Sequence, residues 1–136
     1  MPFDKQWIAV QVFPDVWVGD ARTFERVEDL YKQGIRSFLA VDAQPPPAVR
    51  QRFRTLHLPF AEDDVTLAEL KNIISRGVQF IRDAVSRGDG VVVQCKRGHH
   101  RSASIVAAFA SEFWPRKEVI KHMRKSRPGA LKPHRR

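Results

Sequence analysis

Residues 90–113 carry the sequence pattern that most restricts how this chain can fold. Residues 91–93 are three consecutive valines between turn residues, which is typical of a short central strand buried on both faces of a parallel sheet. A Lys-Arg-Gly segment follows, and apolar residues at helical spacing then extend over residues 101–113. Because a strand buried on both faces needs helices on both sides of its sheet, this pattern predicts an α/β fold.

The remaining segments alternate between strand and helix patterns. The predicted strands cover residues 16–18, 35–41 and 55–60. The predicted helices cover about residues 23–33, 67–85 and 115–125. Three prolines at 45–47 cannot continue a strand or a helix, so we expect a surface loop there. This alternation indicates a single α/β domain with a central, mainly parallel β-sheet flanked by helices.

The length of the chain, 136 residues of which 43% are hydrophobic, suits one domain. No repeat or Gly/Ser linker divides it, so we interpret residues 1–127 as the domain and residues 128–136 as a basic C-terminal tail. The longest nearly uncharged stretch, residues 102–111, is about half of the roughly 20 residues that a membrane span requires. We therefore expect no membrane span and a cytoplasmic protein, and the basic tail leaves entry into the nucleus open.

Cysteine and histidine usage bears on metals and cofactors. The chain has one cysteine and five histidines. One cysteine cannot form an internal disulfide, and the histidines lack the paired spacing of a zinc site. We therefore expect neither a metal nor a cofactor.

The net charge of +9 is concentrated near the C-terminus. Residues 1–112 hold 15 Lys/Arg and 14 Asp/Glu, whereas residues 113–136 hold nine basic residues and one acidic residue, Glu118. Contact of this basic segment with RNA or acidic lipid is one interpretation, because such a segment attracts anions. The other interpretation is that the basic residues form a solvated helix face and a tail that bind no partner.

The loop between Cys95 and Arg101 is where we expect chemistry. A loop of five intervening residues can curl its backbone N–H groups around a tetrahedral dianion, and the following helix adds its positive end. The predicted phosphate-binding residues are Lys96, Arg97, Gly98, His99, His100 and Arg101. The same field favours a thiolate, so Cys95 is a candidate nucleophile, with a buried structural cysteine as the alternative. Arg101 offers a planar fork for two phosphoryl oxygens, and the Ser102 hydroxyl can donate to the thiolate.

Cys95, five residues, Arg101 and Ser102 form a pattern similar to the signature of the cysteine-dependent protein phosphatases. The small dual-specificity branch resembles the chain in four further segments: residues 16–20, 30–39, 58–60 and 127–128. The resemblance covers roughly residues 8–130. It implies a metal-independent phosphatase that forms a cysteinyl-phosphate intermediate by in-line attack and hydrolyses it with water.

The resemblance also implies a general acid, an aspartate on a loop about thirty residues before the cysteine. Asp63 and Asp64 precede Cys95 by 32 and 31 positions, in an acidic turn after the strand predicted at 55–60. We assign the role to Asp63, with Asp64 as the alternative. A plain surface turn is the interpretation without chemistry.

The chain departs from the family at two positions. Gln94 stands where members usually carry His, and Ala40 stands where they usually carry Asn. In the family both groups help to hold the loop and the thiolate. We hypothesise that Lys96 and Arg97 compensate electrostatically, since they add two cations beside the thiol.

The resemblance implies a phosphorylated protein as substrate, with dual specificity for phosphotyrosine and phosphoserine or phosphothreonine. The basic loop is also somewhat similar to those of relatives that act on inositol pyrophosphates, and RNA 5′-triphosphates are a further class to consider. A phosphate-binding module with little or no catalysis and a nucleic-acid-binding protein are the alternatives from other classes.

Overall fold

A computed structural model gives the fold of the chain and describes residues 8–61, 63–96, 101–126 and 131. Its centre is a five-stranded sheet in the order β1-β2-β5-β3-β4. The strands are β1 (Ala9–Phe13), β2 (Val16–Gly19), β3 (Ile35–Ala40), β4 (Arg54–His57) and β5 (Gly90–Gln94). β1 pairs antiparallel with β2, whereas the pairs β2–β5, β5–β3 and β3–β4 are parallel. The predicted mainly parallel sheet is confirmed.

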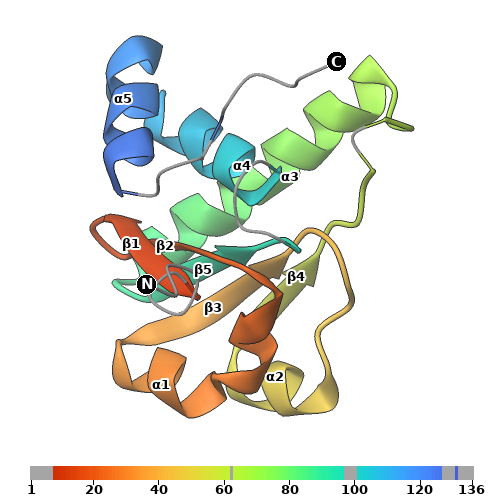
Figure 1. The fold of residues 1–136 in the computed structure, drawn as a ribbon, viewed down its shortest axis with the longest axis vertical. Helices are drawn as coiled ribbons and strands as arrows, with labels where there is room; N and C mark the ends of the chain where they lie inside the picture. The colour runs from red at the N-terminus through yellow and green to blue at the C-terminus, as the bar shows by residue number, and fades with distance from the viewer. Residues whose placement is uncertain (1–7, 62, 97–100, 127–130, 132–136) are drawn as a thin grey trace, which may run out of the picture.

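Helices cover both faces of this sheet (Figure 1). On one face lie α1 (Val27–Lys32) and α2 (Pro47–Arg52). On the other lie α3 (Leu67–Ser86), α4 (Arg101–Ala110) and α5 (Arg116–Ser126). A 3₁₀ helix, η2 (Ala21–Glu25), connects β2 to α1. The three-layer arrangement is the one that the alternation of strands and helices predicts.

β5 occupies the middle of the sheet because its valines fill the core on both faces. Val91 and Val93 belong to the larger core beneath α3, α4 and α5, and Val92 belongs to the smaller core beneath α1 and α2. Side chains alternate along a strand, so Cys95 faces the same side as Val91 and Val93 and joins the larger core. The predicted strand at 91–93 is confirmed, and its alternation decides which helices the cysteine faces.

The other predicted helices on that side of the sheet are also confirmed. The patterns at 67–85, 101–113 and 115–125 correspond to α3, α4 and α5, although α4 ends earlier, at Ala110. Thr66 fixes the start of α3. Its Oγ1 atom accepts from the Glu69 N–H (3.1 Å), while the Glu69 carboxylate accepts from the Thr66 N–H (3.3 Å).

Three predictions of local structure are wrong in part. The helix expected at about 23–33 is divided into η2 and α1, because Arg26 has φ −123° and ψ 37°, outside helical geometry. The strand expected at 55–60 ends at His57, since Pro59 has no N–H for a ladder. The surface loop expected at residues 45–47 is shorter, because Pro47 begins α2 and occupies its first turn, where a helix needs no N–H partner.

β1 has no counterpart among the predicted strands, and α2 has none among the predicted helices. The strands predicted at 16–18 and 35–41 are confirmed as β2 and β3. In the described ranges, the structure contains no helix with the length and apolar character needed to cross a membrane. The predicted tail, residues 128–136, lies outside the described residues apart from Leu131.

Candidate active site

Four parallel strands end at one edge of the sheet, and this edge carries the candidate site. Backbone hydrogen bonds join the strand ends: the Cys95 N–H donates to the Gly19 carbonyl (3.2 Å), and the Val41 N–H donates to the Gln94 carbonyl (2.9 Å). Side chains that follow β2, β3, β4 and β5 therefore converge. Ligands of open α/β sheets bind at such an edge, beyond the carboxyl ends of the strands.

Cys95 follows β5 directly, and Ser102 lies in the first turn of α4. Cys95 is 3% exposed, and Ser102 is fully buried. The Cys95 Sγ atom lies 3.2 Å from the Ser102 Oγ atom, so the hydroxyl can donate to a thiolate. The first turn of a helix also presents N–H groups without partners inside the helix, together with the positive end of the helix dipole. The structure thus brings together the predicted nucleophile and the predicted hydroxyl donor.

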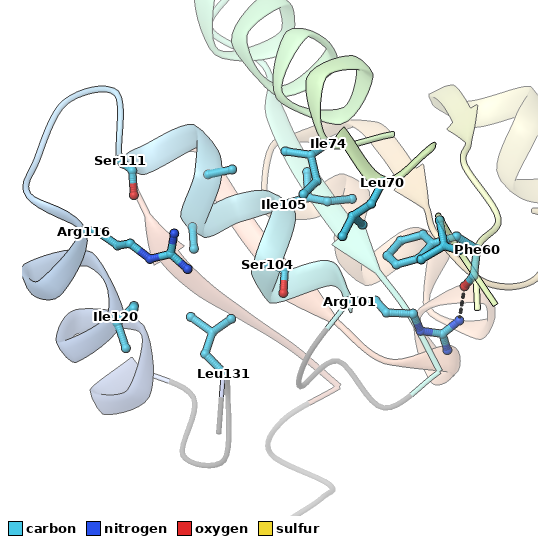
Figure 2. Close-up of a pocket in the computed structure, with 13 residues that line it drawn as sticks. Phe60, Leu70, Ile74, Arg101, Ser104, Ile105, Ser111, Arg116, Ile120 and Leu131 are labelled. Carbon is cyan, nitrogen blue, oxygen red and sulfur yellow. Dashed lines mark hydrogen bonds between the residues drawn. The ribbon is translucent and has the colours of Figure 1, made fainter. Parts of the chain in front are cut away.

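Arg101 connects α4 to the ends of β3 and β4. Its Nη1 atom donates to the Phe60 carbonyl at 2.9 Å, the dashed line in Figure 2, and to the Asp42 Oδ1 atom at 3.3 Å. The Arg101 side chain is 19% exposed, and that of Asp42 is 36% exposed. These bonds hold the guanidinium at the carboxyl edge of the sheet and leave part of it open to a ligand.

The predicted general acids lie in the turn between β4 and α3. Asp63 and Asp64 are both exposed, and the Asp64 N–H donates to the Ala61 carbonyl (3.1 Å). Because the Phe60 carbonyl accepts from Arg101, the segment that carries both carboxylates is attached to the predicted phosphate-binding arginine. The choice between the two aspartates stays a prediction.

Most of the predicted phosphate-binding loop, namely Arg97, Gly98, His99 and His100, lies outside the described residues. Lys96 is described and exposed, and its carbonyl accepts from the Ala21 N–H at 3.2 Å. This bond holds the beginning of the loop against the end of β2.

Gln94 and Ala40, the two departures from the family pattern, face each other in the register of β5 and β3. Gln94 is 1% exposed, and Ala40 is fully buried. Within the described part of the chain, the Gln94 Oε1 atom is buried without a hydrogen-bond donor. The methyl group of Ala40 supplies none. The two departures therefore meet at one buried spot next to Cys95 in the sequence, where the Gln94 acceptor finds no donor among the described residues.

The sequence prediction omits two acidic residues of this edge. Asp42 receives the hydrogen bond from Arg101. Asp20, which is 7% exposed, accepts from the Arg22 Nε atom (3.1 Å) and the Arg22 Nη2 atom (2.5 Å). A signal for Asp42 was present, because this carboxylate directly follows the strand predicted at 35–41 and so belongs at a carboxyl end.

Groups that bind anions converge here more clearly than groups that bind cations. Among the residues that the structure describes, no three His, Cys, Asp or Glu side chains are grouped to hold a metal ion. The Arg101 guanidinium and the N-terminal end of α4, by contrast, lie at the same edge of the sheet as the Cys95 thiol. The arrangement suits a phosphoryl group next to a nucleophile.

Comparison with known proteins places this arrangement in a family, although no family model matches the chain. Mouse dual specificity protein phosphatase 12 is 34% identical over 104 residues, which cover 74% of this chain and 30% of the relative. Protein phosphatase Slingshot of Drosophila melanogaster is 28% identical over 126 residues, which cover 91% of this chain and 12% of the relative. The chain thus spans less than a third of either relative.

The solved structures give the same result at the level of the fold. Human DUSP28 superposes with a TM-score of 0.78 at 25% identity, covering 93% of this chain and 85% of that chain. The cysteine after the central strand and the arginine at the start of the next helix stand where the phosphatase signature that the sequence resembles requires them. The chain belongs to the small, atypical dual-specificity branch of the cysteine-dependent protein phosphatase superfamily.

Proposed function

We propose that this chain is a metal-independent dual-specificity phosphatase that hydrolyses phosphotyrosine and phosphoserine or phosphothreonine in proteins. The observation that carries the proposal is the 3.2 Å contact between the Cys95 Sγ atom and the Ser102 Oγ atom, at the junction of β5 and α4. A candidate nucleophile, a donor for its thiolate and, in Arg101, a fork for phosphoryl oxygens meet at one edge of the sheet. Similarity to dual-specificity phosphatases supports the same activity.

In the first step of the proposed reaction, the Cys95 thiolate attacks the phosphorus atom in line with the ester oxygen. The S–P bond forms as the ester P–O bond breaks, and the leaving oxygen takes a proton from Asp63. Arg101 and the N–H groups at the start of α4 stabilise the charge on the other three phosphoryl oxygens. The product is the dephosphorylated substrate and a cysteinyl-phosphate.

In the second step, a water molecule attacks the phosphorus atom and gives its proton to the Asp63 carboxylate. The S–P bond breaks, inorganic phosphate leaves, and the Cys95 thiolate is restored. The Ser102 hydroxyl donates a hydrogen bond to the departing sulfur, which lowers the energy of the thiolate as its charge develops.

The assignment of Asp63 as the acid predicts a dependence on the leaving group. Asp63→Ala should lower kcat for phenyl phosphate on the order of 100-fold, because a poor leaving group needs the proton. The kcat for 4-nitrophenyl phosphate, a substrate with an acidic leaving group, should fall less. Asp64→Ala serves as the matched control in the same turn and should change little. The reverse pattern would move the role to Asp64.

The activity itself is tested by phosphate release without metal and under reducing conditions. The substrates are a phosphotyrosine peptide, a phosphothreonine peptide, an inositol pyrophosphate and an RNA 5′-triphosphate, with Cys95→Ser as the blank. Release from both peptides that vanishes in the blank supports the proposal. Preference for either polyphosphorylated substrate would change the substrate class. Binding of all four without release would identify a phosphate-binding module.

The proposal also covers where in the cell the protein acts and which molecules it contacts. A nucleophilic thiol must stay reduced, which supports the cytoplasm as the place of action and is compatible with the nucleus. The substrate is a phosphorylated protein. The basic residues after Phe113 support a secondary contact with RNA or acidic lipid, since their charge attracts polyanions.

A further inference from the structure

A groove of about 520 Å³ begins beside Arg101 and follows one face of α4 (Figure 2). Arg101, Ser104, Ile105, Ala108 and Ser111 line it at helical spacing. Leu70 and Ile74 of α3 form one wall, and Ile120 of α5 contributes to the opposite side. The volume is within the range of ligand-binding clefts, roughly 300–1,000 Å³. The groove therefore continues the candidate active site along the protein surface.

Arg116, the first residue of α5, is the second cation of the groove. Figure 2 shows its guanidinium pointing into the groove from the end opposite Arg101. Within the described residues, Arg116 makes no hydrogen bond and no ion pair, and the groove lining contains no Asp or Glu. Arg101, in contrast, already donates to the Asp42 carboxylate and to the Phe60 carbonyl. The charge of Arg116 is thus available to a second anionic group on a ligand whose phosphate is bound at Arg101.

We propose that Arg116 selects phosphopeptide substrates that carry an acidic residue three to five positions from the phosphorylated residue, with an apolar side chain between them. This proposal rests on the proposed phosphatase function. Arg101 begins α4, and Ser111 directly follows its last residue, so the two lie ten residues apart, which corresponds to about 15 Å along the helix axis. An extended peptide covers that distance in about four or five residues at roughly 3.3 Å each. The isoleucine and leucine side chains between the arginines receive the apolar residue.

Other occupants fit the groove less well. An acyl chain would place hydrocarbon against the Arg116 guanidinium, and desolvating an unpaired cation is unfavourable. Leu131 of the C-terminal tail already contributes to the lining of the groove, whereas Lys132, Arg135 and Arg136 of the tail carry charges that Arg116 repels. A second copy of a chain with net charge +9 is repelled overall. A peptide with an apolar and an acidic residue complements both the apolar lining and the charge of Arg116.

The test compares two phosphopeptides that differ only in Glu or Lys four positions from the phosphorylated residue. The wild-type protein should prefer the Glu peptide in kcat/KM by roughly three- to tenfold, because the pair is partly exposed. Arg116→Glu should invert this preference through KM, with kcat unchanged, since the contact is made equally in the ground state and the transition state. Lys117→Glu is the matched control: Lys117 is exposed on the same helix and does not line the groove, so this variant should keep the preference.

Hydrolysis of 4-nitrophenyl phosphate separates this proposal from the proposed function, because that substrate does not reach Arg116. Both variants should hydrolyse it at the wild-type rate. An unchanged peptide preference in Arg116→Glu would overturn the proposal. It would also be overturned if Arg116→Glu lost only the binding to vesicles that contain a phosphoinositide and kept the peptide preference. If the wild-type protein hydrolyses no substrate, the proposed function fails, and dissociation constants of the same two peptides for the Cys95→Ser protein then decide the role of Arg116.

Discussion

At the scale of single residues, the surroundings of Arg101 combine an attraction with a repulsion. The Phe60 carbonyl and the Asp42 carboxylate both accept from its Nη1 atom, at 2.9 and 3.3 Å. The backbone of Asp42 is itself positioned, because the His57 Nε2 atom lies 2.8 Å from the Asp42 carbonyl oxygen and can donate to it. The carboxylate therefore helps to position the guanidinium, and it also places a negative charge close to where a phosphate dianion would bind.

We predict that Asp42→Asn strengthens the binding of inorganic phosphate by about two- to fivefold. The amide oxygen keeps an acceptor for Arg101, while the repulsion between carboxylate and dianion disappears. Two unit charges about 4 Å apart interact by roughly 1 kcal/mol when water screens them fully. Competitive inhibition by phosphate measures the effect, and it should shrink at high salt. Weaker phosphate binding in Asp42→Asn would mean that positioning by the carboxylate outweighs the repulsion.

At the scale of elements, the contact between β3 and β5 depends on a missing side chain at Gly90. The Gly90 N–H donates to the Gly34 carbonyl at 3.0 Å. A Cβ atom at this position would lie 2.9 Å from the Gly34 carbonyl oxygen and 3.0 Å from the Ile35 Cα atom. Both are backbone atoms, so relief requires the two strands to separate.

Gly90→Ala should therefore lower the free energy of unfolding by about 1–3 kcal/mol. Urea denaturation measures the loss, and Ser86→Ala, an exposed position just upstream, is the control that should change little. Gly90 lies at the opposite end of β5 from Cys95, so the activity of the folded fraction should be retained. Wild-type stability in Gly90→Ala would show that the strands can shift without loss.

The helix that sequence patterns miss, α2, is held by contacts with distant residues. The Arg52 guanidinium forms an ion pair with Glu28 of α1 and lies 4.4 Å from the centre of the Tyr31 ring. The hydrogen bond with Glu28 raises the pKa of Arg52 above its usual value. A six-residue helix gains little from its own propensity, so these tertiary contacts with α1 support it.

At the scale of the whole molecule, the charge is divided between a nearly neutral domain and a basic end. Residues 1–112 carry one excess positive charge, whereas residues 113–136 carry eight. Exposed arginines and lysines of α5 provide part of that charge in the described structure. An anion is attracted to this side of the molecule before it makes any specific contact.

Removal of residues 128–136 should weaken binding to single-stranded RNA without changing the hydrolysis of 4-nitrophenyl phosphate. The deletion removes Lys132, Arg135 and Arg136. At roughly 0.7 per cation, the slope of log Kobs against log salt should become shallower by about 2. A titration of RNA binding at several salt concentrations measures the slope. An unchanged slope would mean that α5 or another face makes the contact and the tail does not.

The sequence by itself determined the fold class, and it predicted the chemistry. The valine run at 91–93 predicted the central strand, and the loop between Cys95 and α4 predicted the contact of Cys95 with Ser102. Such inferences succeed because hydrophobic periodicity and short-range spacing are local properties, and a strand, loop and helix that follow one another place their residues together. The helix beginning at Leu67 was predictable for the same reason, since its cap lies within four residues.

Only the tertiary structure decided which distant groups complete the site. Asp42 and the Phe60 carbonyl reach Arg101 across 59 and 41 positions in the chain. Arg116 turns towards a groove whose walls come from α3, α4 and α5. The parallel sheet order creates these encounters by bringing the ends of β3, β4 and β5 to one edge. No periodicity within a single segment encodes that order, because it depends on how all the strands pair at once.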